Sequence, residues 1–263
     1  MNFTILRYDT IGSTNTEAAN QAKLGADEGL CVIADQQTAG RGRYGRTWIS
    51  ENGSGLYFSI VLRPKIELRY LPLITLTAGV AVHDALKEFR VRPDIKWVND
   101  ILVGDKDDGK KISGILAETV ETEKGLAVVV VGIGVNLTSA NFPDEIAGSA
   151  TSIKAETGKI VTPDELAEVL TRYLSYFYNI LHDQNGHAEI IGEWRRRSSY
   201  FSGKHVCVTL ASSTFDGTTD GLEENGALRV KTLGGSVRIV QAGDVERLRI
   251  TPDAIVPGSD ILT

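Results

Sequence analysis

The sequence contains few of the residues that build metal sites, disulfide scaffolds or membrane spans. Two of its 263 residues are cysteines, Cys31 and Cys207, and they lack the close spacing of metal ligands. We therefore interpret them as reduced thiols in the core of a cytoplasmic protein. The most apolar run, residues 126–137, is too short to cross a bilayer, and the N-terminus has no signal-peptide pattern.

Positive charge is also in short supply. The chain carries 28 Lys and Arg against 34 Asp and Glu, which gives a formal net charge of −6 and a pI of about 5.3. Proteins that bind nucleic acids in general usually have a basic surplus, so this balance argues against that class. It leaves room for a local basic pocket. Hydrophobic residues make up 42% of the chain, enough to bury a substantial core.

Periodicity predicts alternating strands and helices over the first 200 residues. Strands are expected at 3–8, 29–37, 55–64, 94–103, 111–120 and 125–137, and helices at 13–25, 71–89, 162–181 and 187–197. Thr14 and Thr162 each precede a glutamate by three residues, which predicts two capping boxes. His83 has no ligand partner at helical spacing, so we expect an ordinary, partly exposed histidine. The Asp/Gly-rich residues 104–111 predict a hairpin turn.

After about residue 200 the sequence changes to short strands with tight turns. Asn225–Gly226 and Gly234–Gly235 are hairpin signals. This pattern predicts a small β-barrel of roughly fifty to sixty residues, which is close to the lower size limit for a domain with its own core. We therefore expect one domain at 1–200 and a second at 201–263. We find no repeat, no helix-turn-helix before the first strand and no motif in the last dozen residues.

Glycine and arginine alternate in the segment TAGRGRYGRTW, residues 38–48, which joins two predicted strands. Glycine lets the backbone approach a ligand, and successive N–H groups form anion-binding concavities. Arginine adds a permanent planar charge suited to phosphate and carboxylate. Trp48 would stack on a flat ring such as adenine. The segment therefore indicates a site for an anionic ligand, and a flexible basic surface loop is the alternative.

Three further polar motifs follow this segment. In KWVND, Asp100 is a candidate Mg²⁺ ligand beside nucleotide phosphates, although Asn99–Asp100 also has the composition of a turn. In KKISG, Lys111 lies on a strand where an unpaired ammonium would be costly, so we expect an anionic ligand to be its partner. The pair Gly132 and Gly134 in GIGVN is equally consistent with close strand packing.

Taken together and in this order, the motifs closely resemble those of biotin protein ligases. The matching segments are STN at 13–15, QTAGRGRYGRTW at 37–48, KWVND at 96–100, KISGIL at 111–116 and GIGVN at 132–136. Val98 departs from the pattern, because the family usually has proline there. The resemblance implies an α+β fold with a mixed β-sheet flanked by helices, like class II aminoacyl-tRNA synthetases. It also implies a C-terminal SH3-like β-barrel, in the short form of the enzyme without an N-terminal DNA-binding domain.

The resemblance implies a two-step reaction. Biotin and Mg-ATP would form biotinyl-5′-AMP and pyrophosphate, and the biotinyl group would then pass to one lysine of the biotin carboxyl carrier protein of a biotin-dependent carboxylase. The expected small molecules are biotin, ATP and Mg²⁺, with neither nucleic acid nor membrane as a partner; a homodimer is a family expectation. Because two anions must meet, positive charge should converge at the site.

The resemblance also carries roles onto matching positions of this chain. The implied biotin-binding residues are Ser13, Thr14, Asn15, Gln37, Arg41, Gly42, Arg43, Lys111 and Gly114. The implied nucleotide-binding residues are Arg41, Arg43, Trp48, Asn99, Lys111 and Asn136. The implied catalytic residues are Lys111, Arg43 and Asp100, and Asp100 is also the implied metal ligand and the base for the incoming lysine. Ser13–Thr14 keeps a second reading as a helix cap.

Three alternative functions remain open on the sequence. Lipoate protein ligases resemble this fold and reaction, but the Arg/Gly segment matches the biotin enzymes. An RNA-binding module would use the same segment with Tyr44 and Trp48, which the acidic charge and the single internal copy disfavour. A ligase that is also a repressor would need a DNA-binding element, which we do not expect.

Overall fold

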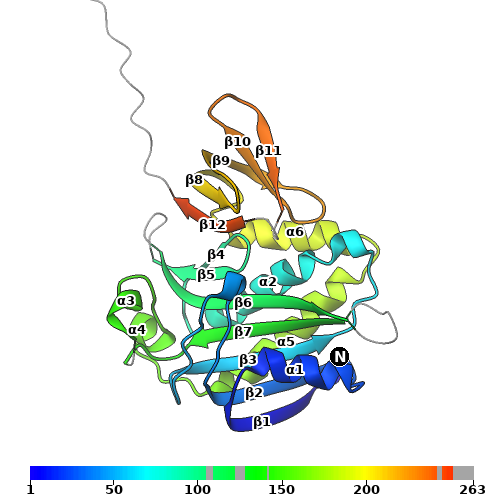
Figure 1. The fold of residues 1–263 in the computed structure, drawn as a ribbon, viewed down its shortest axis with the longest axis vertical. Coiled ribbons are helices and arrows are strands. Elements are labelled where there is room, and N and C mark those ends of the chain that lie inside the picture. Colours follow the sequence, from blue (N-terminus) through cyan, green and yellow to red (C-terminus); the bar gives the residue numbers. More distant parts are fainter. Residues whose placement is uncertain (105–108, 122–127, 141, 242–244, 251–263) are drawn as a thin grey trace, which may run out of the picture.

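The computed structural model describes residues 1–104, 109–121, 128–140, 142–241 and 245–250. A seven-stranded mixed sheet forms the larger part of the molecule (Figure 1). Its strands are β1 (Thr4–Ile11), β2 (Leu30–Gln37), β3 (Gly55–Leu62), β4 (Pro93–Lys96), β5 (Asp100–Val103), β6 (Lys110–Val120) and β7 (Val128–Asn136), in the order β1-β2-β3-β7-β6-β5-β4. The β1–β2 ladder is parallel and the others are antiparallel.

Helices cover both faces of this sheet. The longer ones are α1 (Thr14–Lys23), α2 (Leu73–Glu88), α5 (Pro163–Leu181) and α6 (Gly186–Arg197). The shorter ones are η1 (Arg43–Gly45), η2 (Leu68–Tyr70), α3 (Asp144–Ala147) and α4 (Ile153–Thr157). Ala18 and Ala22 of α1 pack on Val61 of β3, whereas Ile60 faces the main core with α2 and α5. All eight residues of β3 are buried, because both of its faces are covered.

Helix α5 begins as the sequence predicts and α1 does not. The Thr162 hydroxyl accepts the Glu165 N–H, and the Glu165 carboxylate accepts the Thr162 N–H, which completes the capping box. At α1 the N-cap is Ser13, and within the described residues its side chain forms no capping bond. Thr14 is the first helical residue, and its backbone N–H donates to Gln37 instead. The capping box predicted at Thr14 is therefore wrong.

Two further expectations are corrected by the structure. Residues 94–103 form two strands, β4 and β5, which pair antiparallel with Lys96 opposite Asp100; the three residues between them form a turn whose Trp97–Val98 peptide is cis. His83 is buried rather than partly exposed, because its Nδ1 lies 2.8 Å from Asp84 Oδ1 under α6. The predicted turn at 104–111 falls partly outside the described residues.

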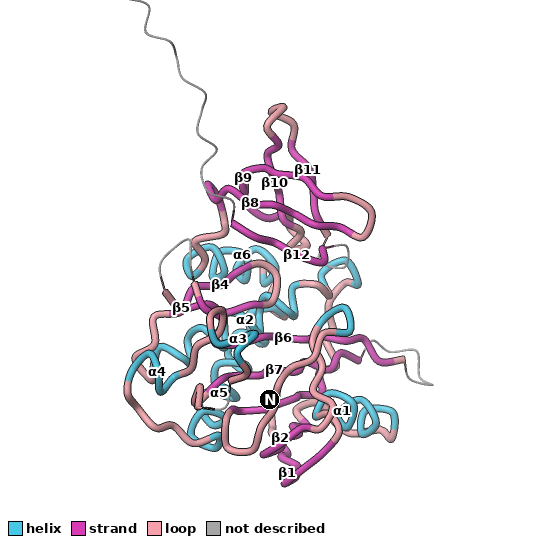
Figure 2. Tube along the Cα trace, turned by 60° about the vertical axis from the view of Figure 1, so that its left-hand side comes forward, coloured by secondary structure: helices cyan, strands magenta, loops and turns pink. Residues whose placement is uncertain are grey.

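A second, smaller sheet follows α6 in the chain. It contains β8 (Ser202–Leu210), β9 (Thr214–Leu222), β10 (Leu228–Thr232), β11 (Val237–Val240) and β12 (Val245–Ile250), in the order β11-β10-β9-β8-β12, and every ladder is antiparallel. Figures 1 and 2 show it beside α6 at one end of the molecule. Gly226 and Gly235, with φ of 82° and 83°, form the two predicted hairpin turns.

The two sheets share one hydrophobic core. Val206, Leu228 and Val240 of the smaller sheet belong to the same cluster of buried side chains as α2 and α5. The expected α+β fold, a mixed sheet with helices plus a small antiparallel sheet, is therefore confirmed. Cys31 and Cys207 are not joined in a disulfide; Cys31 is buried and Cys207 is half-buried. Within the described residues, no helix has both the length and the apolar character that a membrane span requires.

Candidate functional site

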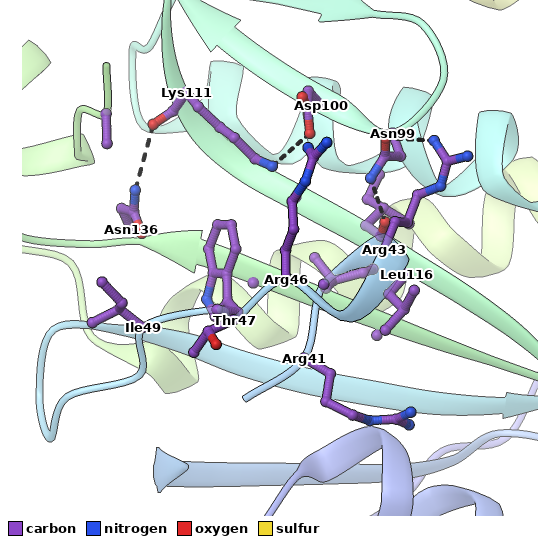
Figure 3. A pocket seen from close by; sticks show the side chains of 18 of the residues that line it. Arg41, Arg43, Arg46, Thr47, Ile49, Asn99, Asp100, Lys111, Leu116 and Asn136 are labelled. Carbon is purple, nitrogen blue, oxygen red and sulfur yellow. Dashed lines mark hydrogen bonds and ion pairs between the residues drawn. The ribbon is translucent and has the colours of Figure 1, made fainter. Parts of the chain in front are cut away.

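A cavity of about 650 Å³ opens over β6 and β7 of the larger sheet, beside α1 (Figure 3). Every site residue proposed from the sequence lines it: Ser13, Thr14, Asn15, Gln37, Arg41, Gly42, Arg43, Trp48, Asn99, Asp100, Lys111, Gly114 and Asn136. These residues come from five segments of the chain, 13–15, 37–48, 99–100, 111–114 and 136. The sheet brings them together because β6 lies between β5 and β7, and β3 lies next to β7.

Glycines on the two central strands form the floor of the cavity. Gly114 of β6 is paired with Gly134 of β7, and neither has a side chain above the sheet. The Trp48 indole lies directly on both: a Cβ added to Gly134 would be 2.4 Å from the indole, and one added to Gly114 would be 2.9 Å from it. Gly132 supports the Asn15 amide in the same way, at 2.1 Å. The GIGVN glycines therefore make room for the Trp48 and Asn15 side chains on the floor of the cavity, rather than for close packing of another strand.

The Arg/Gly segment joins β2 to β3 and folds over the sheet. Gly42 N–H donates to the Arg46 carbonyl at 2.7 Å, and Trp48 N–H donates to the Gly40 carbonyl at 3.0 Å, so the segment doubles back on itself. Tyr44 and Gly45 have φ of 55° and 69°, which produces the tight reversal between them. The segment is thus a folded loop above the cavity.

The three arginines of this loop lie in different places. Arg43 donates from Nη1 to Asn99 Oδ1 at 3.3 Å, at the cavity wall. Arg46, an arginine of the predicted anion-binding segment that received no specific role, lines the cavity and extends into it in Figure 3. Arg41 turns away from Lys111 in Figure 3 and forms a bidentate ion pair with Glu118 of β6, at 2.9 and 2.7 Å. Positive charge therefore converges from the loop onto one end of the cavity.

Lys111 has a partner within the protein, contrary to our expectation. Its Nζ lies 2.6 Å from Asp100 Oδ1 and 5.3 Å from the centroid of the Trp48 ring. Burial alone would raise the pKa of Asp100, but the positive charges of Lys111, Lys96 and Arg43 outweigh it and hold that pKa below its usual value. Asp100 is therefore a carboxylate at neutral pH, and Lys111 is held ready at the cavity wall.

Uncharged polar groups line the other end of the cavity. Gln37 Oε1 accepts from the Thr14 N–H at 2.8 Å, and the Gln37 amide donates to Ser50 Oγ at 2.8 Å. Ser59 Oγ lies 2.8 Å from Thr14 Oγ1 and 2.7 Å from Asn15 Oδ1. These bonds fix the rotamers of groups that both donate and accept, which suits a neutral polar ligand such as a urea or an amide.

Two residues of this network, Ser59 and Glu118, were not predicted from the sequence. Ser59 is a fully buried serine in an otherwise apolar strand, and that isolation was the available signal. Glu118 lies two residues beyond Leu116 on the cavity face of β6 and accepts from Asn15 Nδ2 at 2.8 Å as well as from Arg41. The Asn15 amide also donates to the Leu116 carbonyl at 3.2 Å.

Two other candidate residues are engaged with backbone in the structure. Asn136 Nδ2 donates to the Thr151 carbonyl at 2.9 Å, beside the Trp48 indole, and to the Lys111 carbonyl at 3.4 Å. Asn99 Nδ2 donates to the Ile115 carbonyl at 2.9 Å, which leaves its Oδ1 toward Arg43. Both amides are therefore held in fixed orientations at the edge of the cavity, near the ion pair between Lys111 and Asp100.

A metal ion at this site would depend on Asp100 and on the ligand. Among the described residues, no group of three or more His, Cys, Asp or Glu side chains is arranged to hold an ion. Mg²⁺ does not need such a cage, because it is commonly bound by one or two carboxylates together with substrate phosphates. A single ionised Asp100 at the cationic end fits that mode.

Comparisons with known proteins agree with this geometry. A model described as the Biotin/lipoate A/B protein ligase family matches residues 8–136, and one described as Biotin protein ligase C terminal domain matches residues 201–248. The chain is 35% identical over 247 residues to the bifunctional ligase/repressor BirA of Bacillus subtilis, covering 92% of this chain and 73% of that protein. It is 32% identical over 239 residues to the biotin–[acetyl-CoA-carboxylase] ligase of Paracoccus denitrificans, covering 89% and 96%.

A solved structure is similar over nearly the whole chain. The biotin protein ligase from Aquifex aeolicus in complex with biotin and ATP superposes with a TM-score of 0.80 at 29% identity, covering 94% of this chain and 99% of that one. The order of motifs, the mixed sheet and the small terminal sheet agree with these matches. The chain belongs to the biotin protein ligase family.

Proposed function

We propose that this protein is an ATP-dependent biotin protein ligase. It joins biotin to ATP to form biotinyl-5′-AMP and pyrophosphate, and it then transfers biotin to one lysine of the carrier protein of a biotin-dependent carboxylase. Relatives named biotin–[acetyl-CoA-carboxylase] ligase support this carrier, and the Aquifex aeolicus complex supports the two small substrates. The observation that carries the proposal is one cavity with a neutral polar end and a cationic end.

The first step brings two anions together, and the cationic end lowers that barrier. A carboxylate oxygen of biotin attacks the α-phosphorus of ATP, and the bond to the leaving pyrophosphate breaks. Lys111 moves from Asp100 to the developing negative charge between carboxylate and phosphate, and Arg43 with Arg46 neutralises the rest from the loop. Preorganised cations in a partly buried site stabilise such charge far better than solvent water does.

The second step needs no nucleophile from the enzyme. The carrier lysine amine attacks the acyl carbon, the bond to the AMP phosphate oxygen breaks, and AMP leaves with the electron pair. The amine loses its proton in the same step to the phosphate of the departing AMP or to water. The lowered pKa of Asp100 makes it a weak base. We therefore assign Asp100 to holding Lys111 and a Mg²⁺ ion, and the base role implied by the resemblance is the weaker proposal.

The neutral end of the cavity is assigned to the biotin ring system. Ser13, Thr14 and Gln37 supply the hydrogen-bonding groups, and Asn15 is held in place by Glu118 and Ser59. A cyclic urea has two donors and one acceptor, which this set can match. Gly114 lies beside the chain of the ligand, below the Trp48 indole, and Gly42 closes over the ligand's carboxylate from the loop. Arg41 is assigned to that carboxylate as well, which requires its guanidinium to leave the ion pair with Glu118.

The nucleotide is assigned to the rim beside β7. Trp48 offers a flat ring already seated on Gly134, and Asn136 lies next to it. Asn99 and Asp100 hold the phosphates, directly and through Mg²⁺. When bound, Mg²⁺ neutralises phosphate charge and orients the leaving pyrophosphate.

We also propose a division of the chain and a setting for the reaction. The catalytic unit is residues 1–200 and the terminal unit is residues 201–263, which the match of the C-terminal family model from residue 201 supports. The reaction needs neither nucleic acid nor a membrane and takes place in the cytoplasm; the net charge of −6 supports the first of these. A homodimer remains the family expectation, and one chain supplies the cavity lining described above.

The proposed function is tested by incubating the protein with ATP, Mg²⁺, biotin and a biotin carboxyl carrier domain and then weighing the carrier. The carrier should gain the mass of one biotinyl group, with pyrophosphate released. Parallel reactions omit ATP, replace biotin with lipoate, or use a carrier whose acceptor lysine is changed to arginine, and none of these should modify the carrier. Modification by lipoate at the biotin rate would instead assign the chain to the lipoate ligases.

A further inference from the structure

A hydrogen bond joins the smaller sheet to the active-site turn. The turn between β4 and β5 carries Trp97, which is buried, and its indole Nε1 donates to the carbonyl of Gly226 at 3.0 Å. Gly226 lies in the hairpin between β9 and β10, 129 residues away along the chain. Asn99 and Asp100 follow Trp97 by two and three residues, so the bond is close to groups that face the cavity.

The hairpin that supplies this carbonyl is itself rigidly placed. Gly226 has φ of 82°, and its N–H donates to the Glu223 carbonyl at 2.8 Å. A Cβ added to Gly226 would lie 2.8 Å from Leu76 and 2.9 Å from Leu73, both on α2. The hairpin tip is therefore wedged against α2, and glycine is needed there for both the conformation and the space.

The strand that precedes the turn is held from the same side. Ser198, in the connection between α6 and β8, donates its hydroxyl to the Ile95 carbonyl of β4 at 2.6 Å. Ser199 donates its N–H and its hydroxyl to the Asp94 carboxylate at 2.7 and 2.5 Å. The entry to the smaller sheet and its hairpin thus contact β4 and the turn together.

The other end of the turn belongs to the cavity. Asn99 donates from its side chain to the Ile115 carbonyl and accepts from Arg43 of the loop. Asp100 holds Lys111 at 2.6 Å. The turn therefore has a buried anchor on the smaller sheet and polar groups in the site, and a shift at the anchor would displace the groups that face the phosphates.

We propose that Trp97 is a positioning residue, and that the Gly226 hairpin of the smaller sheet acts through it to fix Asn99 and Asp100 for nucleotide activation. The smaller sheet is then part of the machinery for the first step. Its contact bears on the cationic end alone, because the neutral end is built by α1, β2, β3 and β6. The kinetic part of this proposal rests on the proposed ligase function, whereas the structural part does not.

The chain contains a matched control for Trp97. Trp194 is also fully buried, and among the described residues its Nε1 has no hydrogen-bond partner. Trp97→Phe and Trp194→Phe thus remove the same atoms from the core, but only the first removes a hydrogen bond to the hairpin. Gly226→Ala has a similar control in Gly235→Ala, because Gly235 has φ of 83° and, in the described structure, open space around its Cα.

The first experiment is hydrogen–deuterium exchange of the four variants well below their unfolding temperatures. Amides of residues 93–103 should exchange faster in Trp97→Phe and Gly226→Ala than in Trp194→Phe and Gly235→Ala. This measurement does not depend on any activity. Equal exchange of residues 93–103 in Trp97→Phe and Trp194→Phe would overturn the coupling, whatever the enzyme proves to catalyse.

The second experiment is biotin-dependent pyrophosphate exchange with the same variants. Trp97→Phe should raise the KM for ATP, or lower kcat, by at least about fivefold, the effect of one lost hydrogen bond, with an unchanged Kd for biotin. Trp194→Phe should leave both steps within twofold of the parent. If Trp97→Phe weakened biotin binding and ATP binding to the same degree, the hydrogen bond would only stabilise the site in general. That result would overturn the proposed positioning role of Trp97.

Discussion

Glu118 and Arg41 face each other across the edge of the cavity, with both guanidinium nitrogens within 2.9 Å of the carboxylate. A carboxylate beside a site for two anions would repel them if it were unpaired. Arg41 cancels that charge, and Glu118 in turn accepts from the Asn15 amide at 2.8 Å. The pair therefore ties the loop to the neutral end of the cavity.

We predict that Glu118→Ala weakens biotin binding by roughly tenfold, because the Asn15 amide loses an acceptor in a partly buried site. Glu118→Gln keeps an acceptor for Asn15 and removes the charge, so its biotin Kd should change less. Isothermal titration with biotin alone measures both. Equal losses in the two variants would show that the charge of Glu118 in its pair with Arg41, and not the orientation of Asn15, is what matters.

Lys111→Ala is expected to leave folding intact and to lower the rate of adenylate formation by at least about 100-fold, because a preorganised cation at the reacting phosphate is lost. Lys110→Ala is the matched control, since Lys110 is exposed on the preceding residue of β6. Biotin-dependent pyrophosphate exchange reports the step directly. Normal exchange in Lys111→Ala would remove this residue from the catalytic assignment.

Arg43→Ala should let biotinyl-5′-AMP escape from the site. Arg43 donates a hydrogen bond to Asn99 at the cavity wall, so its loss removes a contact between the loop and the turn that faces the phosphates. The expected sign is faster release of the adenylate, trapped by a free amine in solution, with adenylate formation less affected. Arg7→Ala is the control, because Arg7 belongs to the exposed ion pair between β1 and α5, and it should not alter retention of the adenylate. If Arg43→Ala retained the adenylate as well as the parent does, the closing role of the loop would be contradicted.

The half-buried ion pair between Asp84 of α2 and Arg197 of α6 predicts a pH dependence of stability. Burial would raise the pKa of Asp84, but its hydrogen bonds and charge interactions with His83 and Arg197 lower it well below its usual value. A lowered folded-state pKa means that the stabilisation is complete above the unfolded-state pKa of about 4 and is lost as pH falls toward the folded-state pKa.

Asp84→Asn should therefore cost about 2 kcal/mol at pH 7, since Arg197 loses a half-buried ionic partner and keeps only its pair with Glu193. Urea unfolding at pH 7, 5 and 3 measures the difference between the variant and the parent, and that difference should shrink only at the lowest pH. Asp164→Asn is the control, because the Asp164 side chain is 69% exposed in its pair with Arg7. Its effect should stay under about 1 kcal/mol.

Several features of the site could not be found by reading along the chain. Glu118 and Arg41 are 77 residues apart, and no local pattern says that a glutamate on one strand will meet a loop arginine. The expectation that Lys111 awaited an external partner failed for the same reason, since Asp100 belongs to the neighbouring strand β5. The burial of His83 is likewise a tertiary property, since its neighbour Asp84 is bonded to Arg197 of α6, 113 residues away.

The sequence by itself determined the properties that depend on residues close to one another in the chain. These are the strand and helix segments, the capping box at Thr162, the glycine turns at Gly226 and Gly235, and the ordered motifs that line the cavity. The tertiary structure alone decided which side chains meet: Lys111 with Asp100, Glu118 with Arg41, and Trp97 with Gly226. The physical reason is that propensity and periodicity act within one element, whereas these contacts depend on strand register and on how elements dock.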